Sequence, residues 1–150
     1  MGIAEDILTI ESNLNDAIDY GLYYNVLPKA EAKLQQSVIE NVYAAYIPHQ
    51  YKRRGTSEGG LADKSTFIAE LDTGSHTLTL KDGATGIGDC YGVELAEIIA
   101  EGYPFTRFEN DMHPAGGRPF HEAAERELIE SGDADNGIAD ALRTFGFTVI

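Results

Sequence analysis

Residues 67–80 read FIAELDTGSHTLTL and decide the fold class, because they hold the clearest β-like pattern in a chain whose other periodic segments are helical. In HTLTL (76–80) two leucines alternate strictly with two threonines, which is the period of a strand with one covered face. DTGS (72–75) is a turn signal between two apolar runs. The stretch therefore predicts a β-hairpin with strands at 67–71 and 76–80.

Helical periodicity precedes the hairpin. Residues 3–20 carry apolar side chains at a spacing of three and four: Ile3, Ile7, Ile10, Leu14 and Ala17 or Ile18. Residues 28–46 repeat this spacing until Pro48. YGLYYN (20–25) interrupts the pattern with a glycine and an asparagine, so the N-terminal segment is either one kinked helix or two.

After the hairpin, helices are predicted at 92–102, 119–131 and 139–146, and the final FTVI is a candidate edge strand. Residues 49–66 and 103–118 are polar, contain glycine and lack a period, so they are predicted to be loops. Together the patterns predict a single α+β domain over residues 1–150. It has a small antiparallel sheet flanked by a long N-terminal helical segment and C-terminal helices.

The charge balance narrows the possible partners. Twenty-five acids against eleven bases give a net charge of −14 over 150 residues. Unaided binding to nucleic acid or to an anionic lipid surface is not expected, because both need an excess of Lys and Arg. Neither a secretory signal nor an apolar run long enough to span a bilayer is recognised, so the chain is expected in the cytoplasm where it is made. The one cysteine, Cys90, is insufficient for an internal disulfide or a cysteine metal cluster.

Residues 116–132, GGRPFHEAAERELIESG, contain a partial metalloenzyme pattern. A zinc helix of the metalloprotease type needs a second histidine four residues after the first, and that position holds Glu125. A site built from His113, His121, Glu122 and Glu125, with Asp111 as another possible ligand, defines an alternative function, a small metal-dependent hydrolase. The simpler reading is a helix start, in which Pro119 forms the first turn and the glutamates complement the helix dipole.

The stretch YKRRG (51–55) is the one three-base cluster of this acidic chain. It is either a solvated loop or a contact with an acidic surface of another subunit or partner, for which arginine is well suited. Arg118, at a predicted loop–helix junction, is a second candidate of the same kind. The candidate subunit or partner interface therefore comprises Tyr51, Lys52, Arg53, Arg54 and Arg118.

Several short motifs occur in an order that resembles a known family. The chain holds YIPHQYKRR (46–54), GGLAD (59–63), LAEII (95–99) leading to a glycine, and HPAGGRPF (113–120) opening the last long helix. This order is similar to that of the neck or tail-completion proteins of long-tailed bacteriophages, which are also described as minor structural or head–tail joining proteins.

The resemblance implies a structural role. Proteins of this family form rings between the portal or connector and the tail terminator or tail tube, and DNA passes through the lumen without specific binding. The resemblance thus implies a homo-oligomeric virion component, assembled in the cytoplasm of the host bacterium, with no catalytic site, cofactor or membrane partner. An acidic lumen would suit sliding DNA, because it repels phosphate.

Overall fold

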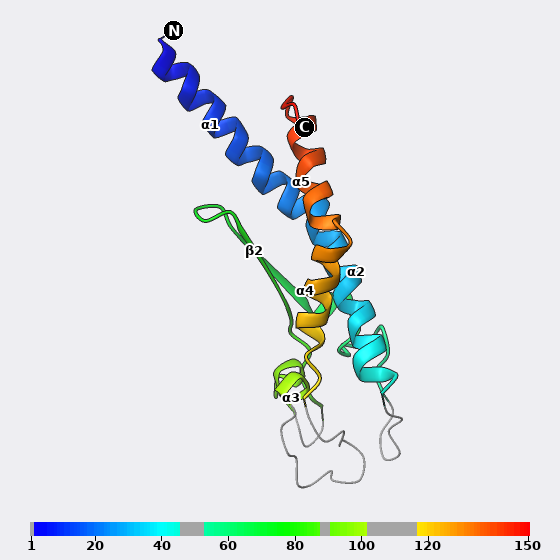
Figure 1. Ribbon diagram of the computed structural model, residues 1–150. Coiled ribbons are helices and arrows are strands. Elements are labelled where there is room, and N and C mark those ends of the chain that lie inside the picture. Colours follow the sequence, from blue (N-terminus) through cyan, green and yellow to red (C-terminus); the bar gives the residue numbers. More distant parts are fainter. Residues whose placement is uncertain (1, 46–52, 88–90, 102–116) are drawn as a thin grey trace. The chain divides into compact units, whose positions relative to one another are not determined.

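The computed structural model describes residues 2–45, 53–87, 91–101 and 117–150, and it confirms the α+β class (Figure 1). In chain order the main elements are a helical run over 3–43, a two-stranded antiparallel sheet, and three further helices. The strands are β1 (Phe67–Asp72) and β2 (Thr77–Asp82); the helices that follow are α3 (Leu95–Glu101), α4 (Phe120–Glu130) and α5 (Asp133–Thr144).

The N-terminal segment is one continuous helical run. It consists of α1 (Ile3–Tyr20), the π-helical η1 (Gly21–Val26), α2 (Leu27–Ser37) and the π-helical η2 (Val38–Tyr43). The interruption expected at 20–25 is therefore a widened turn inside a helix, where the Leu27 N–H donates to the Leu22 carbonyl five residues back. Pro28 lies just after this widened turn, within α2.

The chain divides into two compact units, and each is described by itself. The first contains Met1–Ala30, Ala69–Leu80 and Leu128–Ile150; the second contains Glu31–Ile68 and Lys81–Glu127. Neither unit is a continuous stretch of chain. The expectation of a single domain over 1–150 stays a prediction.

The first unit is built on the packing of α5 against η1 and the end of α1. Gly21 and Gly137 make this close approach possible. A Cβ on Gly21 would lie 2.8 Å from the Ala141 Cβ, and a Cβ on Gly137 would lie 2.8 Å from a Val26 methyl. The Asn25 side chain donates a 2.8 Å hydrogen bond to the Gly137 carbonyl. The glycine and the asparagine that resemble helix breakers in the sequence are thus helix–helix contact residues.

The second unit has a small apolar core between the end of the long helical run and the start of α4. Phe120 is its largest fully buried side chain, and the Ser37 hydroxyl satisfies the Phe120 carbonyl with a buried 2.7 Å hydrogen bond. The other buried apolar residues of this unit are Leu34, Val38, Val42, Leu61, Ala62, Ala84, Ala96 and Ala124. The spacing over 28–46 predicts that Leu34, Val38, Val42 and Tyr46 share one helix face. The first three are buried, and Tyr46 lies outside the described residues.

Three predicted elements differ from the structure. The helix expected at 92–102 is α3, which begins three residues later, at Leu95. The last helix begins at Asp133, six residues before the expected start at 139, because Gly132 adopts a left-handed φ of +73° and ends α4 there. Asp133 and Asp135 then occupy the first turn of α5, where the helix dipole favours acids. The FTVI segment forms no strand, so its assignment as an edge strand was wrong.

Candidate interaction surfaces

Arg53, a predicted interface residue, contacts the end of the long helical run. Its guanidinium lies 4.6 Å from the centre of the Tyr43 ring, and its Nη1 donates a 2.7 Å hydrogen bond to the Tyr43 carbonyl. Tyr43 is the last residue of η2, where carbonyls have no partner within the helix. Arg53 therefore combines a cation–π contact with a helix C-cap.

Arg118 contacts the same helix end from the start of α4. Its Nη1 donates a 3.1 Å hydrogen bond to the Asn41 carbonyl, and its backbone N–H donates to the Ile99 carbonyl at 2.9 Å. Its Nε is buried, with no hydrogen-bond partner among the described residues. Two arginines far apart in the sequence thus bring positive charge to the negative end of one helix, which stabilises that end.

Arg54 contacts its own chain as well. Its Nη2 donates to the Thr85 carbonyl, and its backbone is packed against Gly60, where an added Cβ would lie 2.5 Å from the Arg54 carbonyl oxygen. Tyr51 and Lys52 lie outside the described residues. Arg53, Arg54 and Arg118 are all partly covered by intramolecular contacts, and their role between subunits stays a prediction.

Two aspartates that the sequence analysis did not single out organise the loop beside these arginines. Asp63 accepts hydrogen bonds from the Gly59 N–H at 2.8 Å and the Ser65 N–H at 2.9 Å, and these bonds lower the pKa of its carboxyl. Asp82 ends β2 and is 5% exposed. Burial raises the pKa of Asp82 to about 6, although the Ala84 N–H (2.9 Å) and the Thr66 hydroxyl (3.3 Å) both donate to its Oδ1.

The His-Glu segment lies at the start of α4 as expected for a helix start. The imidazole of His121 is half-buried with its ring centre 4.0 Å from that of Phe120, and burial lowers its pKa. Glu122 and Glu125 are exposed. Among the described residues no group of three or more His, Cys, Asp or Glu side chains could hold a metal ion. His113 and Asp111 lie outside the described residues.

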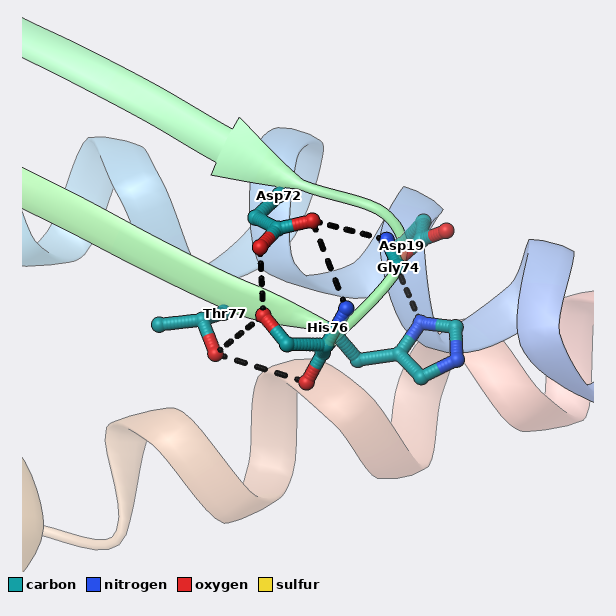
Figure 2. A network of polar contacts seen from close by, with 6 residues as sticks. Asp19, Asp72, Gly74, His76 and Thr77 are labelled. Atoms are coloured by element: carbon teal, nitrogen blue, oxygen red, sulfur yellow. Dashed lines mark hydrogen bonds and ion pairs between the residues drawn. The ribbon is translucent and has the colours of Figure 1, made fainter.

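The tip of the hairpin is fastened to α1. His76 adopts a left-handed φ of +51°, and its Nδ1 lies 2.7 Å from Oδ1 of Asp19 (Figure 2). The turn before it is closed by Asp72, which accepts from the Gly74 N–H at 2.8 Å and from the Ser75 hydroxyl at 2.8 Å. Those bonds lower the pKa of Asp72, the one from the Ser75 hydroxyl most strongly.

The apolar face of α1 is largely uncovered. The exposed fraction falls from 80% at Ile3 to 57% at Ile7 and Ile10, 37% at Leu14 and zero at Ala17. The sequence predicted the apolar face of α1 correctly. Its periodicity did not indicate that α5 covers only the C-terminal end of this face. None of the described helices is both long and apolar enough to cross a bilayer.

A protein-family model, YomN, matches residues 6–144, which is most of the chain. The chain belongs to the YomN family. The YomN match covers nearly all of α1, both strands and α5, together with Arg53, Arg54 and Arg118. No curated protein and no solved structure matches the chain significantly.

Proposed function

We propose that this YomN-family chain is a structural, non-enzymatic component of the bacteriophage neck. Copies of the chain form a ring that joins the portal or connector to the tail terminator or tail tube, and DNA passes through the lumen. Assembly takes place in the cytoplasm of the host bacterium, and the mature location is the virion.

The observation that carries the proposal is the order of short motifs. YIPHQYKRR (46–54), GGLAD (59–63) and GGRPF (116–120) occur in this chain in an order that resembles that of neck and tail-completion proteins. In the structure, Arg53, Asp63 and Arg118 from these motifs each anchor a loop or a helix end. These contacts stabilise the fold of the chain itself.

The exposed apolar face of α1 adds independent support. Ile3, Ile7 and Ile10 are all more than half exposed on one helix. Contiguous exposed apolar surface on a small protein commonly marks a site that another protein covers. A component that binds other proteins of an assembly has such surfaces.

The charge is also compatible with a DNA conduit. A net charge of −14 produces a field that repels phosphate, so the chain would let duplex DNA slide rather than grip it. Three of the bases, Arg53, Arg54 and Arg118, make hydrogen bonds to backbone carbonyls of their own chain. These contacts occupy guanidinium N–H donors that a phosphate would otherwise use.

The proposal is tested by deleting the gene from the phage or prophage that encodes it and examining the lysate by negative-stain electron microscopy. We expect DNA-filled or emptied heads and separate tails, with joined particles restored by the gene supplied in trans. A double variant of His121→Ala and Glu122→Gln that restores joining fully would fit a structural role. Normal joined virions in the deletion, or a joining defect in that double variant with unchanged folding, would contradict the proposal.

A further inference from the structure

The apolar residues on one face of α1 have the spacing of a coiled-coil seam, which continues into Gly21 of η1. Their spacing alternates between four and three, through Ile3, Ile7, Ile10, Leu14, Ala17 and Gly21. This alternation is the heptad pattern in which every first and fourth position faces a partner helix. Ile7, Leu14 and Gly21 take the a positions, and Ile3, Ile10 and Ala17 take the d positions.

One part of this seam already has its partner. Ala17 is fully buried, and Gly21 packs against Ala141 and Ile138 of α5. The helix α5 ends at Thr144, and the tail that follows leaves Ile3 80% exposed and Ile7 57% exposed. In Figure 1 the N-terminal part of α1 (blue) extends beyond the end of α5 (red). The seam therefore continues from a covered part into an uncovered part.

The charges beside the uncovered seam are acidic. Asp6 takes a g position and Glu11 takes the following e position, the two sites that face a partner's flanking charges. Residues 1–28 contain five acids and no Lys or Arg. The uncovered seam is thus an apolar strip with an acidic border.

This border disfavours a second copy of α1 as the partner. In a parallel pair, Asp6 of one copy would face Glu11 of the other, because g and the next e position meet across the seam. In an antiparallel pair, g positions meet g positions and e positions meet e positions, so acids would again face acids. Both arrangements place like charges together, whereas Lys or Arg at those positions of a partner would form ion pairs.

The helix α2, which contains two lysines, does not supply such a basic partner. Lys29 and Lys33 of α2 lie 3.7 Å and 3.3 Å from Asp133 and Glu127, and Leu34 of the same helix is buried. An anionic membrane surface would be repelled by the acids of α1. The partner that fits the uncovered seam is therefore a different protein, with an apolar strip bordered by Lys or Arg.

We propose that α1 is a docking site for a helix of another protein, one with apolar residues at its a and d positions and Lys or Arg at its e and g positions. This helix covers Ile3, Ile7, Ile10 and Leu14, and its bases pair with Asp6 and Glu11. The inference rests on α1 alone and does not depend on the neck function proposed above.

The test uses the full chain and two fluorescently labelled peptides of three heptads (about 21 residues) with Leu at every a and d position. One peptide has Lys at e and g, and the matched peptide has Glu there. Fluorescence anisotropy at pH 7 should show binding of the lysine peptide at least about tenfold tighter than that of the glutamate peptide. The preference should weaken as the salt concentration rises, because the flanking ion pairs lie at the surface.

Three variants locate the site. The double variant Ile7→Ser and Ile10→Ser should weaken binding of the lysine peptide by at least about tenfold. Leu8→Ser is the matched control, because Leu8 is 65% exposed on the same helix but lies outside the seam. The double variant Asp6→Lys and Glu11→Lys changes charge at exposed positions and should reverse the preference toward the glutamate peptide. Circular dichroism confirms that each variant keeps its helices.

Equal binding of the two peptides, or binding unaffected by the seam variants, would overturn the proposal. So would dimerisation of the wild-type chain through α1 in light scattering, lost in the Ile7→Ser and Ile10→Ser variant, because the occupant would then be a second copy. Binding to vesicles containing anionic lipid that depends on Ile7 and Ile10 would also overturn it.

Discussion

Gly21 of η1 lies so close to Ala141 of α5 that a Cβ on Gly21 would be 2.8 Å from the Ala141 Cβ. The contact is repeated at Gly137 of α5, whose added Cβ would be 2.8 Å from a Val26 methyl. Real Cβ atoms do not approach other atoms this closely. The two glycines therefore set the distance between α5 and the helical run, and the packing of the first unit depends on both.

We expect Gly21→Val to destabilise the chain by about 2 kcal/mol, because the branched side chain must push α5 away. Urea unfolding followed by circular dichroism measures the loss. Gly55→Ala is the control, since a Cβ there meets no atom within 4 Å and the residue is exposed, and it should change stability by less than about 0.5 kcal/mol. Unchanged or increased stability of Gly21→Val would show that the close approach is not needed.

Asp82→Asn should change how stability depends on pH. In the folded chain burial raises the pKa of Asp82 from 3.8 to about 6, so the folded state holds this proton more tightly than the unfolded state. The stability that this provides is full below about pH 4 and is lost as the pH rises through about 6. Relative to Asp82→Asn, wild type should lose on the order of 2 kcal/mol between pH 4 and pH 7.

Asp72→Asn is a control for which the pH dependence of stability should have the opposite sign. The bonds from Ser75 and Gly74 lower the pKa of Asp72 in the folded chain, so its contribution is present near neutral pH and is lost as the pH falls below its usual range. Urea midpoints measured from about pH 2 to pH 8 separate the two, because the Asp72 contribution is lost only below the usual pKa of an aspartate, about 3.9. A wild-type profile parallel to that of Asp82→Asn would contradict the assignment of Asp82.

Removing an arginine cap should destabilise the end of the long helical run. We expect Arg118→Ala to cost about 1 kcal/mol, because the Asn41 carbonyl loses its charged donor. Arg126→Ala is a matched control, an exposed arginine within α4, and should change stability by less than about 0.5 kcal/mol. Thermal unfolding compares the two. If Arg118→Ala and Arg126→Ala unfold at the same temperature, the capping role is wrong.

The contact between His76 and Asp19 should hold the hairpin tip closed. With His76→Ala the 2.7 Å contact is lost, and a residue less suited to the left-handed φ takes its place. Amide hydrogen exchange of β1 and β2 should then be faster by about five-fold, the equivalent of about 1 kcal/mol. Thr79→Ala, an exposed change in the same hairpin, should leave the exchange rates nearly unchanged. Equal amide exchange rates in the two variants would show that His76 does not hold the hairpin tip closed.

Elements governed by local pattern were predictable from the sequence. The hairpin lies within two residues of its expected bounds because the Leu–Thr alternation and the turn signal act over a few positions. The start of α4 differs by one residue from the expected position, since Pro119 marks it. The beginning of α5 was missed because Gly137 resembles a helix breaker, whereas in the structure it is a packing residue.

Long-range contacts account for what the sequence did not reveal. Arg53 and Arg118 were selected as bases suited to an interface, but their carbonyl partners at Tyr43 and Asn41 follow only from the folded chain. Asp82 is one of twenty-five acids, and only its burial separates it from the rest. The apolar face of α1 was visible in the sequence, whereas its partial coverage depends on where α5 ends.

The proposed structural role in the phage neck can be tested by cryo-electron microscopy of intact virions from the phage or prophage that carries the gene. We expect a ring of copies between the portal and the tail, with acidic side chains facing the DNA channel. A neck that is fully occupied by other proteins would show that the chain has no such role. A ring of this chain whose lumen is lined by the bases of 51–55 would contradict the expected acidic channel.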